Sequence, residues 1–136
     1  MKIIRNILVV IAGIIIGSCV NMYIINYMPT LIKFPASVNL KEIESLKEGM
    51  HLFKAKHFLS FFLAHAAGVL AGAFIAARLG VSKNFILAMI VGTFFLMGGI
   101  YMVTVLPAPI WFCALDVIVA YIPMAYLGWK LSGRGR

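Results

Sequence analysis

Acidic side chains are almost absent from this sequence of 136 residues, which has four Asp and Glu residues against twelve Lys and Arg. Three acids, Glu42, Glu44 and Glu48, lie in one short segment, so Asp116 is the only acid elsewhere. With only two cysteines and three histidines, the chain offers no quartet of metal ligands, no phosphate-binding glycine loop and no nucleophile paired with a base. The sequence therefore assigns no metal, no cofactor and no catalytic residue, and it favours a non-enzymatic role.

Charge is also missing from four long runs, at residues 6–28, 58–77, 84–106 and 111–129, the last interrupted only by Asp116. The composition is 63% hydrophobic, and each run is close to the ~20 residues that a helix needs to cross the hydrocarbon core. No run alternates between polar and apolar residues, as the strands of a membrane barrel do. We therefore predict an all-α membrane protein with one membrane domain over residues 1–136. Its four-helix bundle would have spans at about 6–28, 58–78, 84–106 and 110–130.

The net charge of +8 does not indicate nucleic-acid binding, because the basic residues gather at the ends of the spans. They occur at the N-terminus, in the second loop and at the C-terminus, as Lys2, Arg5, Arg78, Lys83, Lys130, Arg134 and Arg136. These segments fall on one side of a four-span protein, and the positive-inside rule assigns that side to the cytoplasm. We expect a multi-pass protein of the inner cell membrane with both termini cytoplasmic and its basic ends near anionic lipid headgroups.

The N-terminal run has a second interpretation, a cleaved lipoprotein signal ending at Cys19. The uncleaved span is favoured, because the apolar run continues past Cys19 to Met28. A disulfide between Cys19 and Cys113 is not expected. Helical rise puts the two residues ~15 and ~6 Å below the outer face, and a disulfide needs Cα atoms within about 7 Å.

The first loop, residues 29–57, is the only long segment outside the membrane, and it is expected to be external. An amphipathic helix is predicted over about 39–50, with Asn39 as its N-cap and Glu42 completing a capping box. Its apolar stripe, which contains Leu46 and Met50, would lie on the membrane surface or cap the bundle. A loop without fixed structure is the alternative.

One polar residue of each span falls in the same layer of the outer leaflet. At helical rise, Asn21, His65, Tyr101 and Asp116 lie ~9–12 Å from the outer end of their spans. A lone carboxylate facing lipid is costly, so Asp116 should turn inward, where His65 is its only ionisable partner. Tyr101, Asn21 or Tyr121 could also donate hydrogen bonds to it. This layer is either a titratable site for protons or a small polar ligand, or a set of hydrogen bonds that only holds the helices together.

Small residues form stripes on the first two spans, where they would allow close helix packing. The first stripe is Gly13 and Gly17, continued by Asn21, and the second is Ala64, Gly68, Gly72 and Ala76. Pro123 removes a backbone hydrogen bond from the fourth span and predicts a kink there. A weak repeat relates Asn6, Tyr23 and Pro29 to Asn84, Tyr101 and Pro107, each 78 residues later, as in transporters built from two similar halves.

Residues 50–72 contain the motifs Met-His-Leu-Phe, Lys-His-Phe and Ala-His-Ala-Ala-Gly, and the third loop reads Leu-Pro-Ala-Pro-Ile-Trp-Phe with Leu-Asp following. With these motifs the chain resembles small four-span integral membrane proteins of bacteria, over nearly its whole length. That group has no assigned activity, so the resemblance implies a fold and a bacterial membrane but no function.

Three functions are compatible with this sequence. The favoured one is an accessory or assembly subunit of a larger membrane complex, because the chain is small, has no soluble domain and carries small-residue stripes. Its partners would be the lipid bilayer and other membrane subunits or further copies of itself. A small oligomeric transporter or channel-like protein is the alternative, and a membrane enzyme acting on a lipid or quinone is the third. A water-filled cavity at His65 would favour transport, a sideways groove there an enzyme or lipid binder, and exposed small-residue stripes a subunit.

Overall fold

Four helices in the computed structural model, which describes residues 1–135, are long and apolar enough to cross a membrane. The first three spans are α1 (Lys2–Leu31), α3 (Ala55–Leu79) and α4 (Asn84–Val105), and the fourth consists of α5 (Ile110–Val119) followed by α6 (Ile122–Trp129). No strand occurs among residues 1–135. The predicted all-α fold with four spanning helices is confirmed, and the chain has the architecture of an integral membrane protein.

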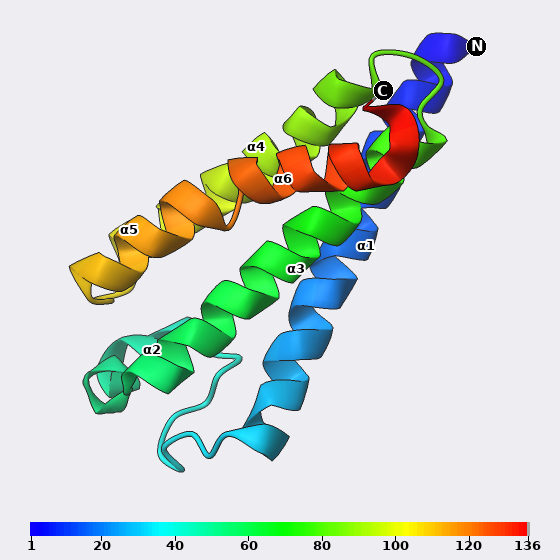
Figure 1. Ribbon diagram of the computed structural model, residues 1–136. Helices are drawn as coiled ribbons and strands as arrows, with labels where there is room; N and C mark the ends of the chain where they lie inside the picture. The colour runs from blue at the N-terminus through cyan, green and yellow to red at the C-terminus, as the bar shows by residue number, and fades with distance from the viewer. Residues whose placement is uncertain (136) are drawn as a thin grey trace.

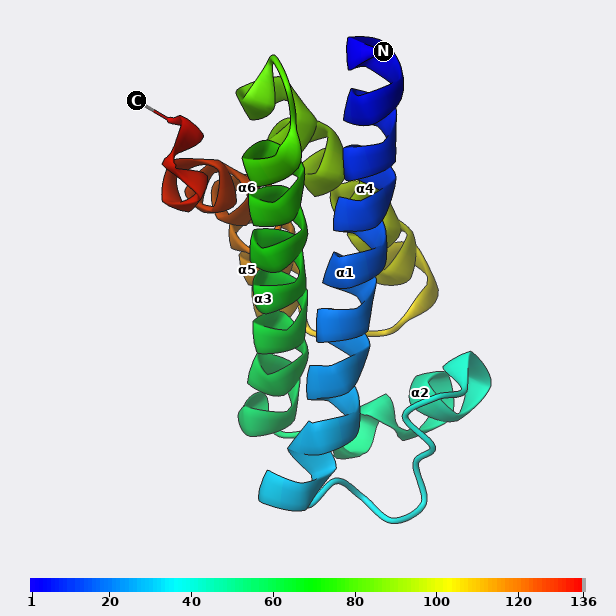
Figure 2. The same cartoon turned by 90° about the vertical axis from the view of Figure 1, so that its right-hand side faces the viewer.

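Helix α3 is the central element of the bundle. It packs against α1 along its length and against α4 and α6 on its other side (Figure 2). Figure 1 shows two arms, α1 with α3 and α4 with α5 and α6, which lie close together near the chain ends and separate toward α2. Small buried residues allow the close approach, and Ala73, Ala76, Ala77, Ala88 and Ala125 are all fully buried.

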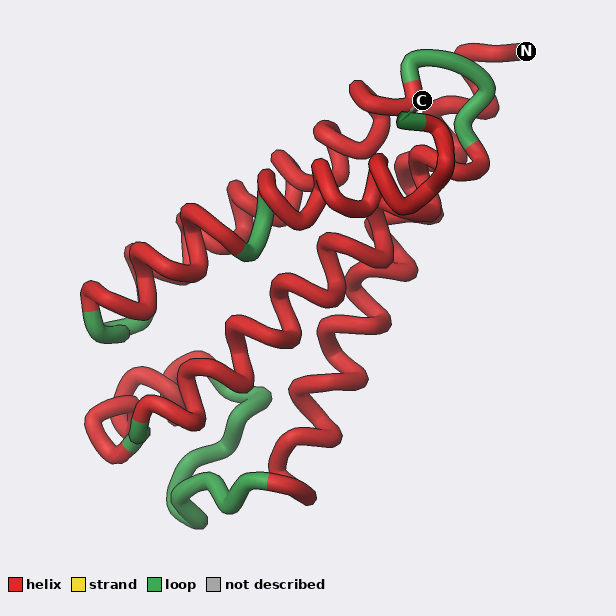
Figure 3. The backbone as a smooth tube through the Cα atoms, viewed as in Figure 1, coloured by secondary structure: helices red, strands yellow, loops and turns green. Residues whose placement is uncertain are grey.

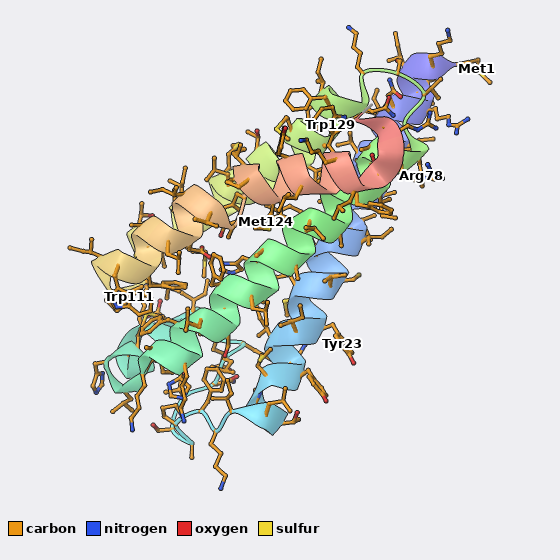
Figure 4. The ribbon with its side chains drawn as sticks, viewed as in Figure 1. Met1, Tyr23, Arg78, Trp111, Met124 and Trp129 are labelled. Carbon is orange, nitrogen blue, oxygen red and sulfur yellow. The ribbon has the colours of Figure 1, made fainter. Side chains whose placement is uncertain are left out.

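Both termini and the α3–α4 connection lie at the same end of the bundle (Figure 1). Basic side chains join these segments, because Arg5 donates to the carbonyl oxygen of Leu79 at 3.3 Å and Arg78 donates to that of Ser132 at 3.2 Å. Helix C-termini leave carbonyl groups without partners, and these guanidinium groups satisfy some of them. In Figure 4, Met1, Arg78 and Trp129 lie toward this end and Trp111 lies at the other, while Tyr23 points away from the bundle.

The fourth span is interrupted at Ala120 and Tyr121, which separate α5 from α6 (Figure 3). Tyr121 has φ −109° and ψ −79°, outside ordinary helical geometry. Pro123 follows in the first turn of α6, a position where its missing N–H leaves no intrahelical hydrogen bond unmade. The interruption therefore lies just before Pro123, and it turns the backbone at Tyr121.

The long first loop carries the short helix α2 (Ile43–Gly49) and a 3₁₀ turn, η1 (Met50–Leu52). The predicted start at Asn39 is wrong, because Asn39 forms a local turn instead, its side-chain oxygen accepting from the backbone N–H of Lys41 at 3.0 Å. Glu42 precedes the helix without a side-chain capping bond. The helix caps the bundle where the arms separate, through an apolar cluster of Leu46, Met50, Phe53, Phe58 and Phe112.

His57 fixes this loop at the start of α3. Its Nδ1 accepts from the backbone N–H of Lys54 at 2.8 Å, and its Nε2 donates to the carbonyl oxygen of Lys33 at 3.0 Å. A neutral ring with its proton on Nε2 satisfies both bonds. The ring is buried against Phe34 and Phe53, so His57 has a structural role in joining the two ends of the loop.

Candidate functional site

His65, Asp116 and Tyr121 form one hydrogen-bonded cluster between α3 and the interrupted fourth span. His65 Nδ1 lies 2.9 and 3.0 Å from the two carboxylate oxygens of Asp116. The Tyr121 hydroxyl donates to Asp116 Oδ2 at 2.8 Å and lies 3.2 Å from His65 Nδ1. The cluster thus joins the two ionisable groups that the sequence places inside the spans.

Local backbone geometry brings Tyr121 to this cluster. In a continuous helix, residues five positions apart point to different sides, but the interruption after α5 turns Tyr121 back toward Asp116. Gly99 of α4 makes room for the tyrosine ring, because a Cβ at Gly99 would overlap the Tyr121 hydroxyl and ring. A glycine, a helix break and a tyrosine together complete the polar cluster.

The hydrogen bonds assign roles to the two nitrogens of His65. Nδ1 faces the Asp116 carboxylate and therefore carries the proton that it donates, which leaves Nε2 with a free lone pair in a neutral ring. Asp116 is almost fully buried, whereas His65 keeps about a quarter of its side chain accessible, 24% against 5%. A carboxylate that orients an imidazole in this way leaves the opposite nitrogen as a hydrogen-bond acceptor or base.

His65 lies between two cavities. The first, which we name the capped chamber, has a volume of about 150 Å³ and extends from Asp116 and His65 to Leu46 and Met50 of the first loop. The second, the lateral groove, has a volume of about 440 Å³ and contains His65, Asn21 and Tyr121. Its α4 side is formed by the exposed side chains of Phe94, Met97 and Tyr101, so the groove opens on the lipid-facing surface of the bundle.

Asn21 and Tyr101, the other two residues of the predicted layer, form no hydrogen bond with His65 or Asp116 among the described residues. Both line the lateral groove. The side-chain oxygen of Asn21 is buried and has no hydrogen-bond partner among residues 1–135. Tyr101 is 60% exposed at the rim, so the hydrogen bond considered for it belongs to Tyr121 instead.

The small-residue stripes pack against each other within the chain. A Cβ added at Gly13 would lie 2.6 Å from the carbonyl oxygen of Gly72, and one at Gly17 would lie 2.7 Å from that of Gly68. Ala64 and Ala76 are fully buried on α3. The stripes form the α1–α3 interface, and they are not exposed surfaces for another subunit.

The remaining candidate ligands are scattered. No group of three or more His, Cys, Asp or Glu residues is close enough to hold a metal ion within the described part of the chain. Cys19 and Cys113 are free thiols, and Cys113 lies beside the capped chamber with its Sγ 3.7 Å from the carbonyl oxygen of Ala108.

Comparisons of the chain with protein families, curated proteins and solved structures find no match. The resemblance to small bacterial four-span proteins therefore stays a prediction, and the function rests on the geometry of the site.

Proposed function

We propose that this integral membrane protein binds the polar head of a small, membrane-soluble molecule at His65, Asp116 and Tyr121. The observation that carries the proposal is the lateral groove, which leads from the lipid-facing surface of α4 to His65. A sideways opening of this kind favours a lipid or lipid-like ligand over a water-soluble one.

The external loop supports the same conclusion. Leu46, Met50 and Phe53 lie over the α2 end of the bundle and pack on Phe58 and Phe112, so apolar side chains lie between His65 and the water at that end. Nearly all the side chains that line the chamber beneath them are also apolar. The most direct route to His65 therefore leads from the bilayer through the lateral groove, because it crosses neither the apolar loop nor the apolar chamber.

A transport pathway has less support. The two cavities occupy the half of the bundle near α2, while the half near the chain ends is packed with buried alanines and glycines. An enzyme acting on a lipid would use His65 Nε2 as its base and Asp116 to orient the ring. The geometry supports only the first step of that scheme, which is binding of the ligand at His65.

An accessory subunit remains a second candidate. The observation in its favour is that α1 packs mainly on α3 and leaves a long apolar face uncovered, including Ile4, Ile7, Leu8, Ile11 and Ile15. Lipid covers such a face equally well, and the small-residue stripes that suggested a partner are used within the chain. We place the protein in the inner cell membrane of a bacterium, with the basic end in the cytoplasm.

Mass spectrometry of the protein purified from its own membrane in mild detergent tests the proposal. We expect a small amphiphile to remain bound to the wild type and to be lost from His65→Ala, while His51→Ala, a change of an exposed histidine in the external loop, keeps it. Equal lipid content in all three proteins would contradict binding at His65. A stoichiometric protein partner together with that result would favour the accessory subunit.

A further inference from the structure

We infer that the ligand of the lateral groove has a planar aromatic head with a hydroxyl group, as in a phenol or hydroquinone carrying an alkyl chain. This inference rests on the proposed function and adds the chemical class of the ligand. The ring would lie on the backbone of Gly98, next to the Tyr121 ring that covers Gly99, with its hydroxyl directed to His65 Nε2.

The shape of the groove supports a flat ring. Gly98 and Gly99 of α4 are consecutive residues without side chains, and a Cβ added at Gly98 would meet nothing within 4 Å. The backbone at Gly98 is therefore an open floor of the groove, while Tyr121 covers Gly99 beside it. Aromatic and thioether side chains surround it, namely Phe94, Phe95, Met97, Tyr101, Met102 and Tyr121. Such groups make favourable stacked, edge-to-face and sulfur contacts with an aromatic ring.

The polar groups of the groove require a hydrogen-bond donor. His65 Nε2 is the ring nitrogen turned away from Asp116, and in the neutral ring with its proton on Nδ1 it is an acceptor. The buried side-chain oxygen of Asn21 is a second acceptor and has no partner among the described residues. A buried acceptor without a partner costs roughly 1–3 kcal/mol, so a ligand hydroxyl that reaches it replaces a missing bond.

The charges of the site argue against an anionic head. No Lys or Arg is among the residues that line either cavity, and the carboxylate of Asp116 is already beside His65. A phosphate or carboxylate would lie near this carboxylate without a cation to balance it. A neutral hydroxyl donates one hydrogen bond to His65 without adding charge, which separates a phenolic lipid from the phospholipids of the membrane.

The test uses the full-length protein in detergent and compares three probes with the same decyl chain: decylhydroquinone, its dimethyl ether and decanol. Binding is measured by titration calorimetry and by the rise in melting temperature. We expect decylhydroquinone to bind at least about tenfold more tightly than the dimethyl ether, which lacks a donor, since tenfold corresponds to the loss of about one hydrogen bond. Decanol, which lacks the ring, should be weaker by a similar factor.

Gly98→Leu is the decisive variant, because the open space above Gly98 accepts a side chain without displacing the bundle. We expect it to keep the melting temperature of the free protein and to weaken decylhydroquinone binding by at least about tenfold. Ile100→Leu is the matched control, since Ile100 lies on the exposed face of the same helix and does not line the groove. It should bind like the wild type.

The outcomes separate the two proposals. If decanol binds as tightly as decylhydroquinone and Gly98→Leu weakens both, the groove binds amphiphiles but the aromatic class is wrong. If Gly98→Leu leaves decylhydroquinone binding unchanged, the ring does not lie on Gly98 and the inference fails. If no probe binds and no small molecule is found with the purified protein, the proposed function fails as well.

Discussion

At the scale of single residues, the Tyr121 hydroxyl has a clear energetic role, since it donates to the buried carboxylate of Asp116. Tyr121→Phe removes this bond and keeps the ring that packs against Gly99. Hydrogen bonds between membrane helices contribute about 0.6 kcal/mol on average and up to about 1.7 kcal/mol. We expect the stability of the variant to fall by about 1 kcal/mol, measured by thermal unfolding in detergent. Tyr126→Phe, at an exposed position of the same span, is the control and should unfold like the wild type.

His57 gives a second test at this scale. His57→Phe preserves a ring among Phe34 and Phe53 but leaves the Lys33 carbonyl and the Lys54 N–H without their partner. Loss of such bonds at a buried position costs roughly 1–3 kcal/mol. The loop should loosen first, so we expect faster hydrogen exchange over residues 33–54 than in the wild type. The exposed His51→Phe should not change exchange there, and equal exchange in both variants would contradict the role assigned to His57.

The sequence could predict part of the polar cluster, because residue counting gives the depth of a side chain in the membrane but not the direction in which it points. Counting residues from the span ends placed His65 and Asp116 at similar depth, and the structure joins them. Counting gives no information on which way a side chain points when a helix is apolar on every side, as α4 is. Tyr101 therefore seemed as good a partner as Tyr121. Pro123 predicts a kink in this span, but it does not predict that the interruption turns Tyr121 inward against Gly99, because that direction depends on tertiary contacts.

At the scale of elements, the α1–α3 interface depends on glycines that face each other. A Cβ added at Gly72 would lie 2.5 Å from the carbonyl oxygen of Gly13, and both partners are backbone that cannot move aside without separating the helices. We expect Gly72→Ala to lower the stability by about 1–3 kcal/mol, as overpacking does in other cores. Thermal unfolding measures the effect. Gly98→Ala is the matched glycine substitution, and it should cause no loss of stability because its Cβ meets open space.

Helix positions were predictable at this scale because length and hydropathy determine which segments cross a bilayer. The ends of the helices were less predictable from the sequence. Helix α2 begins at Ile43 and not at Asn39, since Asn39 bonds to the backbone of its own turn and to Ser45. The sequence left open whether this helix lies on the membrane surface or caps the bundle, because its position depends on the separation of the two arms. The structure resolves it through Leu46 and Met50, which pack on α3 and α5.

At the scale of the whole molecule, the two halves suggested by the weak repeat differ in form. The second span of the first half, α3, is continuous, whereas the corresponding fourth span is divided into α5 and α6. Asn6 and Asn84, which the repeat aligns, both bond to the backbone of the α3–α4 connection, Asn6 at Ser82 and Asn84 at Gly80, and Asn84 also bonds to Ala77 in the last turn of α3. Their similarity thus has a local explanation in one turn, and duplication stays a prediction.

The basic residues at one end of the bundle predict the orientation of the molecule in the membrane. Arg5, Arg78 and Arg134 gather at the end that holds both termini, and positive charge is retained on the cytoplasmic side during insertion. We expect a cysteine at Ser37 of the first loop to react with a membrane-impermeant maleimide in intact cells. A cysteine at Val81 in the α3–α4 connection should react only after lysis. Both positions are exposed, and Cys19→Ala with Cys113→Ala removes the two natural thiols.

The reverse labelling pattern would place α2 and the capped chamber in the cytoplasm, and the lateral groove would then open to the inner leaflet. Ligand binding at His65 would survive that result, because the groove opens on the lipid-facing side of the bundle in either orientation. The leaflet that supplies the ligand would change. Labelling therefore decides from which side of the membrane the ligand comes, and the Gly98→Leu variant decides independently whether it lies on α4.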